Sequence, residues 1–402
     1  MNANKRDHAV PRTVWALGFV SLLMDTSSEL IHSLLPLYMV GALGASTFLV
    51  GVVEGIAESI ALVVKVFSGY LSDVTRRRKP IVLLGYGLAA ATKIVFPLAT
   101  SLSWIVAARF VDRVGKGIRD SPRDALIADL THDGVRGAAF GLRQALDTVG
   151  AIAGPMLAVV TITAFAGDFR AAFSVALIPA ALCVAVLVFG VHETDAPSHD
   201  EAPPLTWRDA GRLSRSFYIV TAIAVVMTLA RFSEAFLVLR ARDVGLGVQD
   251  APWVMVIMST VYAAVAFPAG RAADRGYSGS LLIGGLSALM VSDILLALAN
   301  GRLLVLAGAG WWGLHMALTQ GVLAALVAAT APADLRGTAF GVFNLASGVA
   351  LLIASSLAGA LWQWAGAQAT FYSGATFALL ALGGLVAFRR SIPDIEHGTS
   401  AA

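Results

Sequence analysis

Long apolar stretches separated by short polar loops fill most of the chain. Each stretch has about the twenty residues that a helix needs to cross the hydrocarbon core of a bilayer. Twelve of them fit within the 402 residues. We place them at residues 14–40, 46–72, 80–100, 102–120, 137–164, 170–191, 216–240, 251–273, 279–299, 302–328, 337–362 and 368–388. The pattern therefore predicts an all-α membrane protein with twelve transmembrane helices.

Composition agrees with this prediction. Hydrophobic residues make up 57% of the chain and charged residues only 14%, with a mean hydropathy of +0.76. The single cysteine, Cys183, excludes an internal disulfide and a thiolate metal cluster. The net charge of +3 is small and comes from short basic loops, so we expect no nucleic-acid partner. The apolar stretches are expected to contact the lipid bilayer. The first apolar stretch lacks a small-residue cleavage site and is expected to be the first span.

The longest hydrophilic segment lies in the middle of the chain and predicts two halves of six helices each. The predicted parts are a tail at 1–12, a helix bundle at 13–191, a linker at 192–215, a second bundle at 216–389 and a tail at 390–402. Lys and Arg gather in alternate loops, above all at residues 76–79. Because basic loops stay in the cytoplasm, both tails and the linker are expected there.

The two halves repeat one another. The segment Arg136–Gly141 recurs as Arg336–Gly341 at an offset of 200 residues, with Thr338 in place of Ala138, and Gly69–Asp73 recurs in part as Gly270–Asp274. Parallel repeats of this kind place a substrate site between the halves, near the middle of the membrane.

Two six-span repeats joined by a cytoplasmic linker resemble the major facilitator superfamily. The loop between spans two and three also resembles the signature loop of that superfamily. The matching residues are Gly69, Leu71, Asp73, Arg77 and Arg78. Val74 and Arg76 stand where the signature has Arg and Gly. The resemblance implies two pseudo-symmetric six-helix bundles and transport by alternating access.

Span five is similar to the antiporter motif of drug/proton exporters, a narrower resemblance. The residues that carry it are Gly141, Gly150, Gly154 and Pro155. Ala158 and Val159 stand where the motif ends in two glycines. The resemblance implies export in exchange for protons; tight packing alone is the simpler interpretation of these glycines.

Span four is unusual because charged residues share one side of it. Arg109, Asp112, Arg113, Lys116 and Asp120 follow a spacing of three and four residues. A charge that faces lipid at mid-bilayer costs at least about 2.5–3.5 kcal/mol. These side chains are therefore expected to face protein or a water-filled cavity, where Arg109 either controls proton access to a carboxylate or forms a static salt bridge.

Spans one and two carry further ionisable groups. Asp25, Glu29 and His32 share one face of span one, and a carboxylate shielded from water can exchange protons near neutral pH. Glu54 and Glu58 share a face of span two. The predicted proton-coupling residues are Asp25, Glu29, His32, Glu54, Glu58, Arg109 and Asp112. Structural hydrogen bonds and ion pairs are the alternative for each.

Two further groups are predicted from the position of polar residues. A cytoplasmic gate of ion pairs, closed in one state and broken in the other, comprises Gly69, Asp73, Arg77, Arg78, Arg119, Arg123, Asp124 and Asp274. A candidate substrate cavity comprises Arg143, Asp147, Arg231, Glu234, Trp312, His315 and Asn344. For Arg143 and Asp147 a self-contained pair is the alternative, and for Trp312 it is core packing.

Because Trp312 replaces Asp112 in the repeat, we assign ion coupling to the first half.

The sequence contains no phosphate-binding loop, no zinc motif and no nucleophile–base set, so we expect no cofactor, no bound metal and no enzyme activity. The leading hypothesis is a monomeric inner-membrane transporter that exports a small organic compound in exchange for protons. Two alternatives stay open. One is proton-coupled import of an anionic metabolite bound by Arg109, Arg143 and Arg231, and the other is metal-cation export through Asp25, Glu29 and His32.

Overall fold

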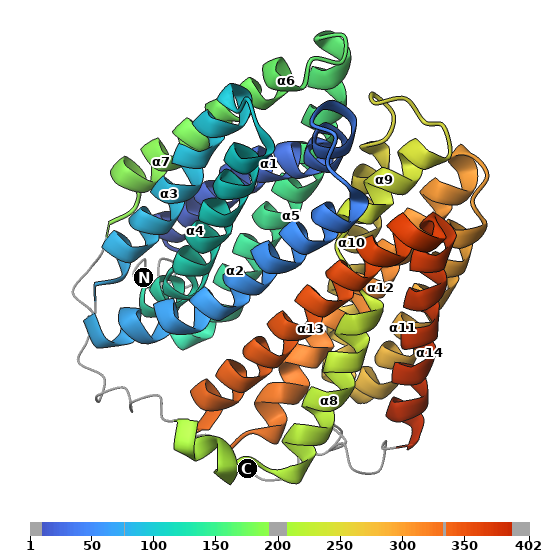
Figure 1. The fold of residues 1–402 in the computed structure, drawn as a ribbon. Helices are drawn as coiled ribbons and strands as arrows, with labels where there is room; N and C mark the ends of the chain where they lie inside the picture. Colours follow the sequence, from blue (N-terminus) through green and yellow to red (C-terminus); the bar gives the residue numbers. More distant parts are fainter. Residues whose placement is uncertain (1–9, 76, 193–206, 333–334, 388–402) are drawn as a thin grey trace. The chain divides into compact units, whose positions relative to one another are not determined.

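The computed structural model of the chain describes residues 10–75, 77–192, 207–332 and 335–387 (Figure 1). The predicted tails fall largely outside these ranges, and so does most of the predicted linker. Within them the chain forms helices and no strand. The first-half helices are α1 (Arg12–Leu37), α2 (Thr47–Thr75), α3 (Arg78–Leu98), α4 (Leu102–Asp129), α5 (Asp133–Ala164), α6 (Phe169–Val175) and α7 (Leu177–Gly190). The second-half helices are α8 (Arg215–Ala230), α9 (Ala235–Asp243), α10 (Trp253–Ala272), α11 (Ser278–Leu298), α12 (Arg302–Thr330), α13 (Arg336–Ala365) and α14 (Ala367–Ala387).

Ten stretches of the described chain are helical, long and apolar enough to cross a bilayer. One of them, Trp253–Leu298, has 46 residues and contains both α10 and α11, which meet at a kink where Gly276 has a φ of 90°. The charged helix α4 is not among the ten. With α4 added and the long stretch counted as two helices, the described chain agrees with twelve crossings. The predicted all-α membrane fold is confirmed.

Helix α4 extends further than the sequence predicts. The predicted span ends at residue 120, whereas the helix continues through the buried Pro122 to Asp129. Hydropathy falls in this segment because it is rich in charge. The buried Arg119 and Arg123 find acidic and aromatic partners within the protein, so the helix does not end where the apolar pattern ends.

The predicted seventh span is broken into two helices. Helix α8 ends at Ala230 and α9 begins at Ala235, so Arg231 and Glu234 do not share the helical turn that their spacing predicts. The backbone N–H of Ser233 donates instead to the hydroxyl of Ser355 on α13, over 3.1 Å. Irregular backbone at membrane depth is tolerated where protein groups satisfy it in this way.

The described helices group into two compact units. Unit 1 comprises Met1–Leu35 and Ile60–Pro204, and unit 2 comprises Pro36–Ser59 and Leu205–Ala402. The division passes through α2, whose residues up to Ser59 group with unit 2. Glu54 and Glu58 therefore belong to a different unit from Asp25 and Glu29.

In unit 1, α3 packs against α4 on one side and against α6 and α7 on another (Figure 1). Glycines bring α3 and α4 unusually close. A Cβ on Gly115 of α4 would lie 2.7 Å from the carbonyl oxygen of Gly85 on α3. The short distance between the backbones lets side chains of one helix reach across to the other.

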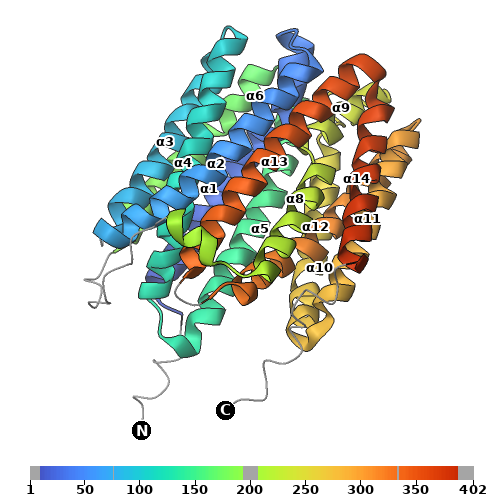
Figure 2. The same ribbon diagram turned by 60° about the horizontal axis from the view of Figure 1, so that its bottom comes forward.

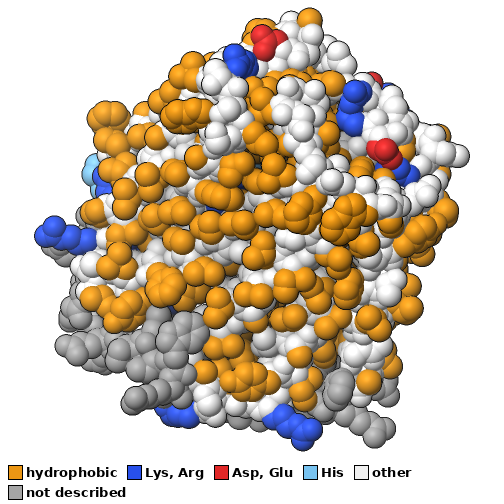
Figure 3. Space-filling model, viewed as in Figure 1, with side chains coloured by type: hydrophobic (Ala, Val, Ile, Leu, Met, Phe, Trp, Pro, Cys, Tyr) orange, Lys and Arg blue, Asp and Glu red, His pale blue; other side chains and the backbone are white. Residues whose placement is uncertain are grey.

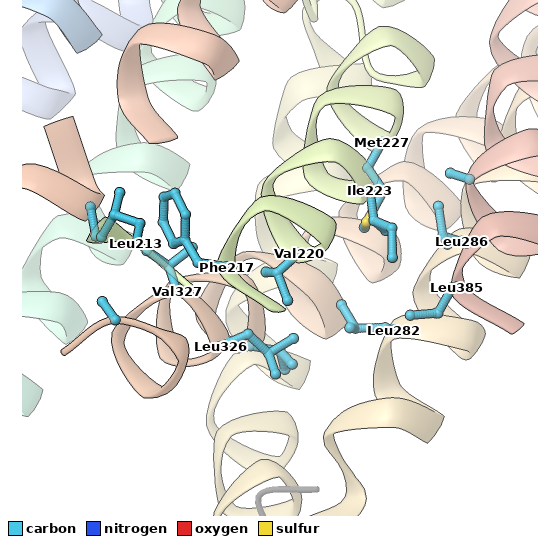
Figure 4. Packing of buried hydrophobic residues seen from close by; sticks show 14 of the residues in the cluster. Leu213, Phe217, Val220, Ile223, Met227, Leu282, Leu286, Leu326, Val327 and Leu385 are labelled. Atoms are coloured by element: carbon cyan, nitrogen blue, oxygen red, sulfur yellow. The ribbon is translucent and has the colours of Figure 1, made fainter. Parts of the chain in front are cut away.

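In unit 2, α11 packs against α12 and α14 (Figure 2). One core cluster of the unit is largely aliphatic, with Val220 and Met227 of α8 and Leu282 and Leu286 of α11, and it also contains the aromatic Phe217 of α8 (Figure 4). On the face drawn in Figure 3, hydrophobic side chains cover most of the surface and charged ones are few. Large apolar side chains such as Phe189 and Leu303 are 78% and 84% exposed, as expected for contact with lipid.

Candidate functional site

The α1 carboxylates lie against the glycines of α5. A Cβ on Gly154 would lie 2.6 Å from Cβ of Glu29, and one on Gly150 would lie 3.0 Å from Cβ of Asp25. Pro155 follows within the same buried turn. The remaining motif glycine, Gly141, has open space around it. Two of the three motif glycines therefore bring the α5 backbone onto the two turns of α1 that carry acids.

The most deeply buried ion pair joins α3 to α4. Lys93 Nζ donates to Asp112 Oδ1 over 2.8 Å and to the Ser28 hydroxyl of α1 over 3.0 Å. Arg113 Nε lies 3.4 Å from the other oxygen of Asp112, and Arg109 Nη1 lies 4.0 Å from it. Both members of the pair are at most 4% exposed. Asp112 thus has three cations around it.

His32 lies among groups from two helices. Its Nε2 contacts the guanidinium groups of both Arg109 and Arg113, and its Nδ1 lies 3.4 Å from Glu29 Oε1. The predicted residues Glu29, His32, Arg109 and Asp112 are therefore brought together in unit 1. Among the described residues no three His, Cys, Asp or Glu side chains are placed to hold a metal ion, so this geometry gives the metal-export alternative no support.

Arg119 links α4 to Asp25. Its Nη2 lies 3.6 Å from Asp25 Oδ1, and its guanidinium carbon lies 4.4 Å from the centre of the Tyr86 ring on α3. Arg123 Nη1, one turn further on, donates to the Tyr86 hydroxyl over 3.3 Å and to the Ser21 hydroxyl over 3.2 Å. Tyr86 is thus a shared partner of both arginines.

Four of the residues predicted as a cytoplasmic gate form two separate groups. Asp73 pairs with Arg78 over 2.9 Å, and Arg78 also contacts Asp129 at the end of α4. Arg119 and Arg123 contact α1 and α3 instead, as described above. Gly69 packs near Ser121, with 3.2 Å between a Cβ placed on it and that side chain. Arg77 and Asp274 are exposed, and Asp274 lies in the kink between α10 and α11.

Arg143 and Asp147 pair within α5 over 2.6 Å, and Arg143 Nε also lies 3.7 Å from Asp124 of α4. Asp124 in turn accepts from Arg123 Nε over 3.1 Å. The α5 pair is therefore part of a chain of contacts that runs into α4, rather than an isolated pair.

Two of the candidate cavity residues, Trp312 and His315, are buried in unit 2. Trp312 is fully buried and packs its ring 5.4 Å from that of Phe232. His315 is buried, and its Nδ1 lies 2.9 Å from the Gly285 carbonyl oxygen. Asn344 is half-buried on α13, and Glu54 is buried on the part of α2 that groups with unit 2.

The sequence comparison decides the family. The family model of the major facilitator superfamily matches residues 17–239 and 219–401. The chain belongs to the major facilitator superfamily. It is 32% identical over 387 residues to an uncharacterized MFS-type transporter of Methanocaldococcus jannaschii, covering 94% of this chain and 95% of the relative. Members of this superfamily are transporters, so the expectation that the chain is a membrane transporter and not an enzyme is confirmed.

Two further comparisons are with less similar proteins. The multidrug resistance protein MdtH of Photorhabdus laumondii is 29% identical over 142 residues, which is 35% of each chain. The crystal structure of a mutant nucleoside transporter, NupG, matches with a TM-score of 0.78 at 15% identity, covering 93% of this chain and 99% of that one. At such low identity the second likeness shows the shared fold alone.

Sequence patterns miss three residues that organise this transporter's unit 1. Lys93 is the one charged residue of α3 beyond its first turn, Tyr86 has the pattern of an ordinary core aromatic, and Asp129 lies beyond the predicted end of span four. A lysine in the middle of an apolar span was a usable signal, because such a charge requires a buried partner.

Proposed function

We propose that this transporter exports a small organic compound in exchange for protons, and that Asp25 and Glu29 carry the protons. The observation that supports this assignment is the exposure of the two carboxyl side chains. The side chains of Asp25 and Glu29 are 28% and 25% exposed, whereas that of Asp112 is 4% exposed. Water can exchange protons with the first two carboxyl groups and is kept from the third.

Asp112 then has a positioning role. Its negative charge is balanced by three cations, those of Lys93, Arg109 and Arg113. Its charge holds the two arginines beside His32. This proposal narrows the set of proton carriers that the sequence predicts.

Proton binding at α1 would change its contacts with α4. A proton on Asp25 removes one of the charges that attract Arg119. Arg119 retains Asp120, whose Oδ1 lies 3.7 Å from its Nε, and the face of Tyr86. Glu29 and His32, 3.4 Å apart, provide a second place where one proton alters contacts with Arg109 and Arg113. Two such arrangements of α1 and α4 are what alternating access requires of an ion-coupled unit.

The remaining features support a carrier of this kind. The contacts of Arg78 with Asp73 and Asp129 join the ends of α2, α3 and α4, and we assign them to the cytoplasmic gate. The α5 glycines that resemble the exporters' motif lie against the two proposed proton carriers. We place the transporter in the inner membrane as a monomer, with both tails in the cytoplasm.

The test first requires a ligand. We would identify it by a thermal-shift screen of the purified transporter, at acidic and neutral pH, against drugs, sugars, organic acids and metals. Proteoliposomes that enclose a pH-sensitive dye then report proton movement driven by a gradient of that ligand. We expect the signal in wild type and in Asp250→Asn, a loop control, and its loss in Asp25→Asn and Glu29→Gln. Ligand accumulation that is driven by an imposed proton gradient and persists with an uncoupler, or both variants moving protons like wild type, would reject the proposal.

One observation favours a second candidate, the import of an organic anion. Arg119 is buried, and its Nε and Nη1 have no hydrogen-bond partner among the described residues. An anionic substrate would supply acceptors for these donors. Organic acids that stabilise the wild type but not Arg119→Gln in the thermal-shift screen, followed by ligand uptake with protons moving in the same direction, would favour import over export.

A further inference from the structure

Asp293, in the C-terminal half of α11, is an acidic group buried in unit 2. Its exposed fraction is 0%, and neither carboxyl oxygen has a hydrogen-bond partner among the described residues. The neighbouring Ser292 does not serve it, because the Ser292 hydroxyl donates to the Gly308 carbonyl oxygen over 2.8 Å. A buried polar group in this situation requires a physical explanation.

The space around Asp293 is small, apolar and aromatic. A Cβ on Gly374 of α14 would lie 2.5 Å from Asp293 Oδ2 and 3.1 Å from the Phe232 ring, so this glycine leaves room for the carboxyl group and for little else. The Phe232 ring packs 5.4 Å from that of Trp312 and 5.6 Å from that of Phe371. Helices α11, α12 and α14 and the break before α9 all contribute to this wall.

The charged and titratable groups on the elements around Asp293 have other partners or lie elsewhere. Arg240 of α9 donates to the carbonyl oxygens of Leu296, Ala297 and Ala299 and pairs with Asp243. On α12, His315 contacts the Gly285 carbonyl. On α14 the titratable side chain is that of Tyr372, which is exposed. Arg231 and Glu234 flank the break, and neither donates a hydrogen bond to the Asp293 carboxyl oxygens.

We propose that Asp293 is a proton-binding site and that in this packing its carboxyl group is held as the neutral acid. An ionised carboxylate, sealed from water and without a cation or a donor, is far less stable than the acid. The room left by Gly374 excludes any larger ligand. One proton bonds to one carboxylate oxygen, and it returns to water when α11 and α14 separate enough to admit water. The inference does not depend on the substrate or on the direction of transport.

Infrared spectroscopy of the purified full chain in lipid nanodiscs tests this directly. A protonated carboxyl group has a carbonyl-stretching band that is separate from the bands of carboxylates and shifts in heavy water. We expect such a band at neutral pH in wild type, its loss in Asp293→Asn, and its persistence in the loop control Asp250→Asn. A wild-type spectrum with no band that Asp293→Asn removes would overturn the proposal.

A second variant keeps the test valid if Asp293→Asn does not fold. Asp293→Glu retains the acid but moves it by one methylene group, so the band should keep its intensity and change its frequency. A sodium titration at constant ionic strength adds an independent readout. Sodium-dependent thermal stabilisation of wild type that is lost in either variant would show a metal cation at Asp293 in place of the proton, and would overturn the proposal.

Discussion

The helix pairs α3–α4 and α11–α12 correspond in the two repeats, yet they bury ionisable groups in opposite ways. Lys93 and Asp112 form an ion pair over 2.8 Å. Two hundred residues further on, the corresponding positions hold Asp293 and Trp312. Neither the Asp293 oxygens nor Trp312 Nε1 has a hydrogen-bond partner among the described residues. The same place in the fold is ionic in unit 1 and apolar in unit 2.

The packing of the two helix pairs is conserved although the charges are not. Gly85 gives room to the Arg119 side chain, and Gly285, at the same offset, gives room to that of Thr319. A close helix pair can therefore enclose either a balanced ion pair or a neutral acid, because both avoid an isolated buried charge. On this account unit 1 retains the charges because proton coupling uses them.

The largest expected effect comes from breaking the ion pair. Lys93→Met leaves Asp112 buried without its nearest cation, and removing one partner of a buried pair typically costs about 3–5 kcal/mol. Thermal unfolding in detergent measures the loss. Lys79→Met, at the exposed start of the same helix, is the control and should lose about 1 kcal/mol or less. A loss from Lys93→Met as small as that of the control would contradict a structural role for the pair.

The next largest effect is expected for one glycine of the α5 motif and not for another. In Gly154→Ala the new methyl group would lie 2.8 Å from the Thr26 carbonyl oxygen and close to Glu29, which forces α5 away from α1. Overpacking of this kind costs about 1–3 kcal/mol, and proton-coupled transport should be lost with it. Gly141→Ala meets open space and should leave both transport and stability near wild type. If Gly154→Ala and Gly141→Ala had equal effects, close packing of α5 against α1 would not explain the loss.

The corresponding substitution in unit 2 should have a smaller effect. Gly374→Ala places a methyl group 2.5 Å from Asp293 Oδ2, but the clash is with a side chain, which can move more easily than a backbone. We expect a loss of about 1 kcal/mol, at the lower end of the overpacking range, in a thermal unfolding measurement. Gly384→Ala on the same helix has no neighbour within 4 Å and serves as the control. A loss from Gly374→Ala no larger than that of the control would show that the carboxyl group is placed differently.

The smallest effect is expected for the isolated acid. Asp293→Asn replaces one neutral group by another of similar shape and should change stability at neutral pH by about 1 kcal/mol or less, because the amide adds a single unpaired donor. Chemical or thermal unfolding beside Asp112→Asn gives the contrast, since that variant leaves Lys93 as an unpaired buried charge. A large stabilisation by Asp293→Asn would mean that the native carboxylate is ionised.

Hydropathy was sufficient to predict the membrane-spanning helices other than α4, because a helix that faces lipid must present an apolar exterior. It failed where charge is balanced inside the protein. The last turns of α4 read as polar, yet they remain helical around buried arginines. The break between α8 and α9 depends on Ser355, which is 122 residues away in the sequence.

The candidate site was predicted in part. Helical spacing placed Glu29 and His32 on one face of span one and Arg109 and Asp112 on one side of span four, and the structure brings the two pairs together. It missed Lys93, whose partner is on the next helix, 19 residues away. The isolation of Asp293 was also beyond the sequence, because its neighbours come from three other segments of unit 2.

Proton release on ligand binding tests the central claim most directly. A ligand identified by the thermal-shift screen is added to the purified transporter in weakly buffered solution, and a pH indicator counts the protons released per molecule. We predict release from wild type and from Asp250→Asn, and none from Asp25→Asn combined with Glu29→Gln, although that variant still binds the ligand. Wild-type release from the double variant would contradict the account.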